Sequence, residues 1–241
     1  MNIGLKTTTF GGRTNFLDSS EVRFIRGGIT LDAAQVAADG GTGLKKLLAG
    51  TFVGVSGGKY RKYIAAVKAH LHTGVVANNN AVLWTAVTGG AAGNSIKVAL
   101  LDPGGNNKPL EVTIINDEIR VNLATGADGA ISSTAAQVIA AVNTHLFAKT
   151  LVLAANDGAS TGAAAVVAAA AAPLAEGANA NVVPSLILAD DVTFSSVDSV
   201  NGVTHADQIV TAIDHARVIS ARLPVAPDDY VRASMPGITW A

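Results

Sequence analysis

A block rich in Gly, Ala and Thr, residues 81–177, divides this chain into two flanks and a centre. The flanks contain the larger share of the aromatic and charged residues. Chains tolerate a whole domain within a loop whose two ends lie close together. We therefore predict a mainly β chain in which a compact α+β domain, residues 80–179, interrupts a small β-rich domain made of residues 21–79 and 180–241, after an N-terminal arm at 1–20.

The composition narrows the class of protein. Of the 241 residues, 49% are hydrophobic but only 5% aromatic, which favours β-rich packing of small side chains over a base-stacking surface. The formal net charge is -1 without long runs of one sign, so we expect neither nucleic acid nor membrane as a partner. With no cysteine, disulfides, thiolate zinc sites and cysteine nucleophiles are excluded.

The sequence predicts neither a secretory signal nor a membrane anchor. The first ten residues lack the basic start and long apolar core of a secretory signal. The longest apolar tract, residues 163–174, is mostly alanine and shorter than the roughly twenty residues that span a bilayer as a helix. We expect that tract to be buried structure.

The first flank alternates between strand-like runs and turns. Residues 21–26 and 29–31 are strand-like, and 32–39 predict one helical turn before a cluster of glycines. Residues 47–55 predict a buried strand. The stretch 59–71 fits either a helical face or a pair of strands, and we favour the strands.

Inside the block the patterns are easier to interpret. Residues 81–85, 95–101, 110–115 and 118–123 alternate as strands. Only Asn116 and Asp117 separate the last two of these runs. Because Asn and Asp suit two-residue turns, these runs predict a β-hairpin.

A helix follows at residues 134–143. Thr134 stands at its start and Gln137 lies three residues later, which is the spacing of a capping box. A strand at 151–154 comes next, and the alanine tract at 163–174 fits either a strand or a helix. These elements complete the predicted α+β domain.

The second flank returns to strand-like patterns. We expect a strand within 184–194, a short helix capped by Thr204, a strand at 217–224 and a last short strand within 230–240.

One motif points to catalysis. Residues 54–58, Gly-Val-Ser-Gly-Gly, match the G-x-S-x-G nucleophile elbow, which would make Ser56 the nucleophile of a serine hydrolase. Acidic residues and histidines follow in the right chain order: Asp190 or Asp191, then His205 or His215. The elbow requires alternating βα units, whereas the surrounding patterns indicate hairpins, so a Gly/Ser hairpin turn is the preferred alternative.

Metal and cofactor sites find little support. His70 and His72 have a spacing that allows chelation from a strand, but no third ligand is implied. The two carboxylates of each adjacent pair, 190–191 and 228–229, point to opposite faces if extended, so they do not converge as an acid/base couple would. We interpret them as carboxylates of turns or strand ends. We therefore expect no cofactor, no metal and no catalytic residues.

A basic and aromatic cluster follows Gly57-Gly58. Since Tyr and Arg are enriched at interfaces, it fits a contact surface for another subunit or an acidic partner, with a solvated face as the alternative. The residues of this surface are Lys59, Tyr60, Arg61 and Tyr63, with Lys62 and Lys68 nearby.

The flanks resemble the lambda-type phage head decoration proteins. The resemblance is carried by residues 26–35, 47–54, Gly58-Lys-Tyr with Tyr63, 185–192 and 221–238. The block is similar to a module of phage structural proteins, found in tails as well as heads, through residues 93–96, 123–125 and 133–142.

This resemblance implies a non-enzymatic, capsid-stabilising protein of the virion. It would be made in the host cytoplasm, form a homotrimer and bind the major capsid protein on the outer surface of the expanded head. A tail tube or sheath protein is the alternative. The arm lacks a period of its own, so we expect a partner to order it. The expected capsid contacts are Thr8, Phe10, Arg13, Phe16, Arg26 and Ile29.

Overall fold

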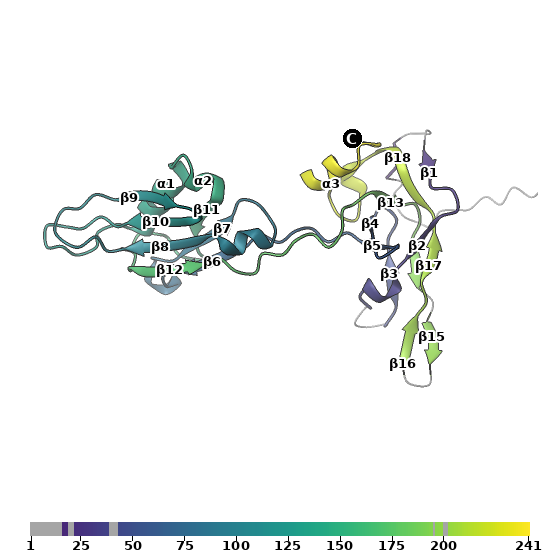
Figure 1. Ribbon diagram of the computed structural model, residues 1–241, viewed down its shortest axis with the longest axis horizontal. Coiled ribbons are helices and arrows are strands. Elements are labelled where there is room, and N and C mark those ends of the chain that lie inside the picture. The colour runs from purple at the N-terminus through teal and green to yellow at the C-terminus, as the bar shows by residue number, and fades with distance from the viewer. Residues whose placement is uncertain (1–15, 19–21, 39–42, 195, 200–201) are drawn as a thin grey trace, which may run out of the picture. The chain divides into compact units, whose positions relative to one another are not determined.

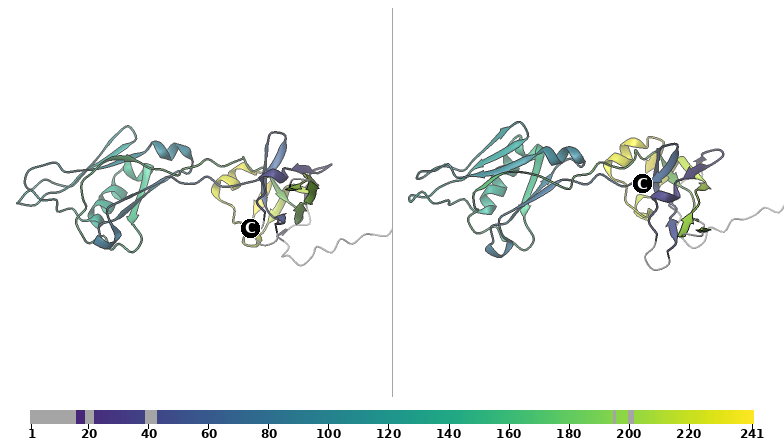
Figure 2. Two further views of the ribbon diagram at one scale, coloured as in Figure 1. Left: turned by 90° about the horizontal axis from the view of Figure 1, so that it is seen from below. Right: turned by 60° about the horizontal axis from the view of Figure 1, so that its bottom comes forward.

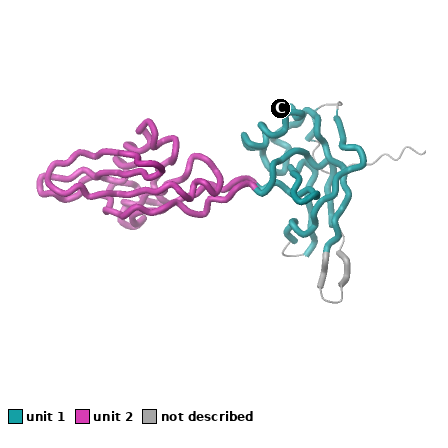
Figure 3. The backbone as a smooth tube through the Cα atoms, in the orientation of Figure 1, with its two compact units in different colours: residues 1–64, 181–241 teal, residues 65–180 magenta. Residues whose placement is uncertain are grey.

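The computed structural model of the chain is mainly β (Figures 1 and 2). It divides into two compact units (Figure 3). Unit 1 is discontinuous and contains the described residues up to Ile64 and from Asn181 onwards, whereas unit 2 is the continuous segment Ala65–Ala180. The residues that the structure describes are 16–18, 22–38, 43–194, 196–199 and 202–241.

Unit 1 is built on one eight-stranded sheet with the order β1-β18-β13-β4-β5-β2-β17, in which β19 also pairs with β18. The first flank contributes β1 (Arg23–Phe24), β2 (Ile29–Leu31), β4 (Phe52–Ser56) and β5 (Lys59–Lys62). The second contributes β13 (Leu186–Leu188), β17 (Gln208–Val210), β18 (Ala212–Val218) and β19 (Ile238–Trp240). Strands of the two flanks are neighbours at three places, so the sheet forms only when both flanks meet.

Each face of this sheet has its own core, because consecutive strand residues point to opposite faces. Val53 packs with Leu31 and Phe194 on one face, while Phe52 packs with Ile187 and others on the second. The first face is covered by η1 (Ala33–Gln35) and the pair β3 (Lys45–Leu47) and β14 (Val192–Phe194). The second face is covered by α3 (Asp229–Ser234). Strands β15 (Ser196–Ser199) and β16 (Gly202–His205) form a hairpin that is not part of the large sheet.

Unit 2 contains two smaller sheets around one core. One sheet has the order β12-β8-β10-β9 and the other β11-β7-β6. Trp84, Val121 and Val138 show how both sheets and helix α1 share this core. The strands are β6 (His70–Thr73), β7 (Val82–Ala86), β8 (Lys97–Leu101), β9 (Glu111–Ile115), β10 (Glu118–Asn122), β11 (Val152–Asn156) and β12 (Ala169–Pro173). The helices are α1 (Ala135–Thr144), α2 (Ala148–Leu151), η2 (Val76–Asn78) and η3 (Ala91–Ser95).

The local predictions for the central block are confirmed. Strands β9 and β10 form the expected hairpin, with Asn116 at a φ of 56° in its turn. Thr134 caps α1, and its hydroxyl accepts from the Gln137 N–H while the Gln137 side chain accepts from the Thr134 N–H. The undecided alanine tract contains strand β12, but most of its residues are exposed, so the expectation that it is buried is wrong.

One prediction for the second flank is wrong, and two expected strands are shorter than their predicted bounds. The helix expected after Thr204 is replaced by strands β17 and β18, because Ala212 and Ile213 belong to the cores on opposite faces of the sheet. The strand expected within 230–240 is confined to β19. Helix α3 precedes it, since the Asp228 carboxylate caps the Val231 N–H. The run 217–224 is a strand only as far as Val218.

The boundary between the parts of the chain also differs from the prediction. Residues 65–79, expected in the first domain, lie in unit 2 because β6 pairs with β7 along its length. Val67 and Ala178 are hydrogen-bonded in both directions within unit 2, so its two ends run side by side. None of the helices in the described ranges has the length and hydropathy needed to cross a membrane.

Candidate partner interface

Two basic residues of the predicted partner surface are bound to carboxylates of unit 1 itself. Arg61 Nε donates to Asp32 Oδ2 at 3.0 Å, and Lys59 Nζ pairs with Asp207 Oδ2 at 2.5 Å. The hydrogen bond from Lys59 holds the pKa of the Asp207 carboxyl below its usual value, and the Ala33 N–H adds to this effect. The Asp207 carboxylate in turn raises the pKa of Lys59.

These ion pairs hold η1 in place. Asp32 Oδ1 accepts from the Ala34 N–H at 3.1 Å, which caps the short helix, and Asp207 Oδ1 accepts from the Ala33 N–H at 2.9 Å. Lys45 Nζ donates to the Ala33 carbonyl at 2.8 Å. The charges of Lys59 and Arg61 are therefore compensated within unit 1, and the partner surface at these residues stays a prediction.

The two tyrosines of the same surface have different environments. Tyr60 is half-buried and packs against the core that contains Val53. Tyr63 donates its hydroxyl to Asp228 Oδ2 at 2.9 Å, and its ring stacks on Tyr230 with centroids 6.2 Å apart. Burial is the largest cause that raises the pKa of Tyr63 to about 12, followed by the hydrogen bond to Asp228. Tyr230 is 47% exposed, so the stack presents one ring to solvent.

Of the expected capsid contacts that the structure describes, two are buried and one is exposed. Phe16 and Ile29 are buried in the two cores of unit 1, so these side chains stabilise the unit and are not part of its surface, contrary to the prediction. Arg26 is exposed in the turn between β1 and β2. The remaining three lie outside the described residues: Thr8, Phe10 and Arg13.

Ser56 does not lie in a nucleophile elbow. It is the last residue of β4 and pairs with Lys59 of β5 across Gly57 and Gly58, whose φ angles are 61° and 79°. These positive φ values suit a two-residue hairpin turn between antiparallel strands. The strand-to-helix turn that the elbow requires is absent at this place.

The histidine pair lies on β6 of unit 2, and each ring faces a carboxylate. His72 Nδ1 lies 2.7 Å from Asp157 Oδ2, and His70 Nε2 lies 3.5 Å from Glu176 Oε2. The two imidazole rings are 5.3 Å apart at their centroids. Within the described parts of the chain, no three potential metal ligands come together.

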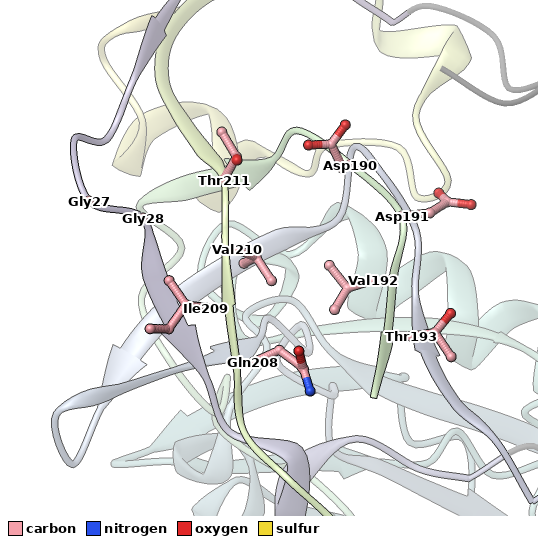
Figure 4. Close-up of a pocket in the computed structure, with 10 residues that line it drawn as sticks. All are labelled: Gly27, Gly28, Asp190, Asp191, Val192, Thr193, Gln208, Ile209, Val210 and Thr211. Atoms are coloured by element: carbon pink, nitrogen blue, oxygen red, sulfur yellow. The ribbon is translucent and has the colours of Figure 1, made fainter. Parts of the chain in front are cut away.

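Unit 1 also has an open hollow of about 510 Å³ that sequence reasoning missed (Figure 4). It is lined by residues 27–28, 190–193 and 208–211. The Gly27-Gly28 and Asp190-Asp191 dipeptides were each interpreted as turns or strand ends. They lie at one site because β17 pairs with β2 and also contacts β14. No local sequence pattern predicts these contacts.

Unit 2 exposes several large apolar side chains. Leu146 and Phe147, between α1 and α2, are 65% and 63% exposed, and Leu153 on β11 is 59% exposed.

The comparison with known proteins does not add to this geometry. No model of a protein family, no curated protein sequence and no solved structure matches the chain.

Proposed function

We propose that this chain is a phage capsid decoration protein that binds the outer surface of the expanded head as a trimer and stabilises the shell. In this proposal unit 1 is the shell-binding domain and unit 2 is a domain inserted into it. The major capsid protein is the partner.

The main support is where the residues that carry the resemblance lie. They come from both flanks, yet every described one of them belongs to unit 1. They contribute to β2, β5, β4 and β13, which are consecutive neighbours in one sheet. The resemblance comes from two segments that are distant in the chain. Because both segments form one sheet, they can together form a single binding surface, as the proposed function requires.

The proposed insertion is supported by the two ends of unit 2. In an inserted domain the first and last residues have to lie close together. Val67 and Ala178 do so within unit 2. Within unit 1, the Asn181 side chain accepts from the Ile64 N–H at 2.8 Å and donates to the Lys62 carbonyl at 2.7 Å.

The proposed mechanism is burial of surface across the boundaries between shell subunits. A trimer makes three such contacts at once. The trimer therefore binds the shell tightly even when the affinity of each single contact is low. Phe16 and Leu17 lie beside the end of β18. The Ile219 N–H donates to the Phe16 carbonyl at 2.7 Å, and Leu17 forms a β-bridge with Val218. Residues 16–18 of the predicted arm, 1–20, thus belong to unit 1, and the proposed shell-binding part of the arm is residues 1–15.

Deletion of residues 1–15 tests this proposal. The truncated protein should no longer sediment with expanded, undecorated heads, while its mass in solution remains that of the oligomer. A control protein in which a Gly/Ser segment of equal length replaces these residues should also fail to sediment with the heads. This result would show that binding depends on the sequence of the arm and not on its length. Undiminished binding of both variants would contradict the proposed role of the arm.

Electron microscopy of the purified protein distinguishes the tail alternative. A head decoration protein should appear as discrete trimers. Spontaneous rings or tubes would instead favour a tail tube or sheath protein, to which modules similar to the block also belong.

A further inference from the structure

Strand β17 is the last strand in the order of the large sheet in unit 1, and among the described residues it pairs with β2 alone. The hydrogen-bond pattern shows which of its groups face outwards. The Asp32 N–H donates to the Tyr60 carbonyl of β5 at 2.9 Å. Because the backbone groups of alternate residues point to the same side, those of Thr30 and Asp32 face β5.

The residues between them consequently face β17. Ile29 is opposite Val210, and Leu31 is opposite Gln208. Ile209 lies between these two hydrogen-bonded pairs, so its N–H and C=O point away from β2. No described residue pairs with either group, and the Ile209 side chain is 74% exposed, more than any other large apolar side chain in the described ranges.

The hollow lies beside this open edge (Figure 4). Val192 is buried and Val210 half-buried, so both give the hollow an apolar lining, while Asp190 stands at one end. Asp191 is already engaged, since it accepts from the Ala49 N–H at 2.8 Å and pairs with Lys46 at 3.0 Å. No hydrogen bond or ion pair joins the Asp190 carboxylate to another described residue.

We propose that this hollow binds an extended polypeptide segment, which adds as a strand to β17 and places a Lys or Arg side chain next to Asp190. The open edge supplies backbone hydrogen bonds, and the valines accept an apolar side chain at alternate positions. The unengaged carboxylate selects a cationic residue. The same carboxylates disfavour a phosphate-bearing partner, because like charges repel.

The volume of the hollow agrees with such a ligand. About 510 Å³ lies within the range of 300–1,000 Å³ that is common for ligand sites, and it accommodates a few residues of a strand. Open strand edges attract other chains unless they are blocked by charge, proline or a covering element. Strand β17 contains neither a charged residue nor proline.

The direct test uses two blocked peptides and the full-length protein labelled with ¹⁵N. One peptide is Thr-Val-Thr-Lys-Val-Thr-Val, and the other has Glu in place of Lys. We expect the Lys peptide to shift the amide signals of residues 27–28, 190–193 and 208–211, with an affinity about three to five times that of the Glu peptide. Shifts elsewhere, equal affinities or no shifts would each overturn the proposal.

Two substitutions at Ile209 isolate the backbone contribution. Ile209→Pro removes the outward N–H without removing a bond to β2, and edge strands tolerate such a proline. It should weaken peptide binding about fivefold or more. Ile209→Thr keeps the N–H and suits a strand, so its affinity should stay within about twofold of the parent.

Asp190→Asn provides an independent test that does not depend on the folding of the proline variant. It should abolish the preference for the Lys peptide, whereas Asp229→Asn, an exposed carboxylate elsewhere on unit 1, should leave the preference unchanged. Retained preference in Asp190→Asn would contradict the proposal. Because no phage head takes part, this test does not depend on the proposed decoration function.

Discussion

The two units are both rich in strands, but they are held together by contacts of different range. In unit 1, neighbouring strands such as β4 and β13 come from opposite ends of the chain, and ion pairs such as Arg61 with Asp32 fix the connecting segments. In unit 2, hairpins and one capped helix surround a single core. Unit 1 therefore folds only when both flanks are brought together, whereas the strands of unit 2 find their partners within one continuous segment.

Asparagine side chains perform the same task in both units. Within unit 2, Asn143 on α1 accepts from the Ala154 N–H at 2.9 Å and donates to the Ala154 carbonyl at 2.8 Å, which completes the outer edge of β11. Asn94 bonds both backbone groups of Gly177 in the same manner. Asn181 does so in unit 1 for Lys62 and Ile64. Each amide replaces a missing strand partner.

The largest expected effect comes from Trp84→Ala. The Trp84 side chain is completely buried in the core of unit 2, and its Nε1 donates to Thr73 Oγ1 at 2.9 Å. The substitution should lower the free energy of unfolding of unit 2 by about 3–5 kcal/mol, because a large cavity remains. Unit 1 has separate cores, so its unfolding transition should not move.

Fluorescence separates the two transitions in this variant. The chain has two tryptophans, and the remaining one, Trp240, lies in unit 1. Its emission during urea unfolding should follow unit 1 alone, while circular dichroism should reveal an earlier loss of unit 2. A single transition at lower urea by both probes would show that the units unfold together.

The local elements of unit 2 could be predicted because their information is local. Thr134 and Gln137 are three residues apart, and Asn116 and Asp117 directly join the two strands of their hairpin. Strand β18 could not be predicted in this way. Its apolar residues also fit a helix, and only burial on two opposite faces of a sheet assembled from distant segments decides in favour of a strand.

A smaller effect is expected from Asn143→Ala. The substitution leaves the partly buried N–H and C=O of Ala154 without partners, which should cost unit 2 about 1–3 kcal/mol of stability in urea unfolding. Asn181→Ala removes the same two kinds of bond in unit 1, where the site is exposed and water replaces the amide. It should cost about 0.5–1 kcal/mol. Equal losses of stability in the two variants would contradict the expectation that the buried site depends more on its asparagine than the exposed site does.

The smallest effect concerns pH. All three tyrosines lie in unit 1, and folding raises the pKa of Tyr63 from 10.0 to about 12. The folded state thus favours the protonated phenol. The stabilisation is complete below pH 10 and is lost as the pH rises from about 10 to about 12.

Tyr63→Phe is the matched variant for this pH prediction. Its unit 1 should show a smaller loss of stability over that interval than the parent protein, and the stability of unit 2 should change equally in both proteins. Tyrosinate absorbance should show a late-titrating phenol in the parent that is missing in the variant. A late phenol that persists in Tyr63→Phe would assign the shift to another tyrosine.

The candidate interface was only partly predictable. The cluster 59–63 was recognised from its basic and aromatic side chains, but the carboxylates that compensate Lys59 and Arg61, those of Asp207 and Asp32, lie far away in the chain. Ile29 was expected at a surface because a short strand does not reveal which face is covered. The hollow beside β17 depends on the same long-range pairing and has no sequence motif.

Cryo-electron microscopy of expanded phage heads incubated with the full-length protein is the decisive experiment for the proposed decoration function. Trimeric density should appear on the outer surface at the three-fold positions, with unit 1 in contact with neighbouring capsid subunits. Shell contact made by unit 2 alone, or heads that remain undecorated at saturating protein, would contradict it.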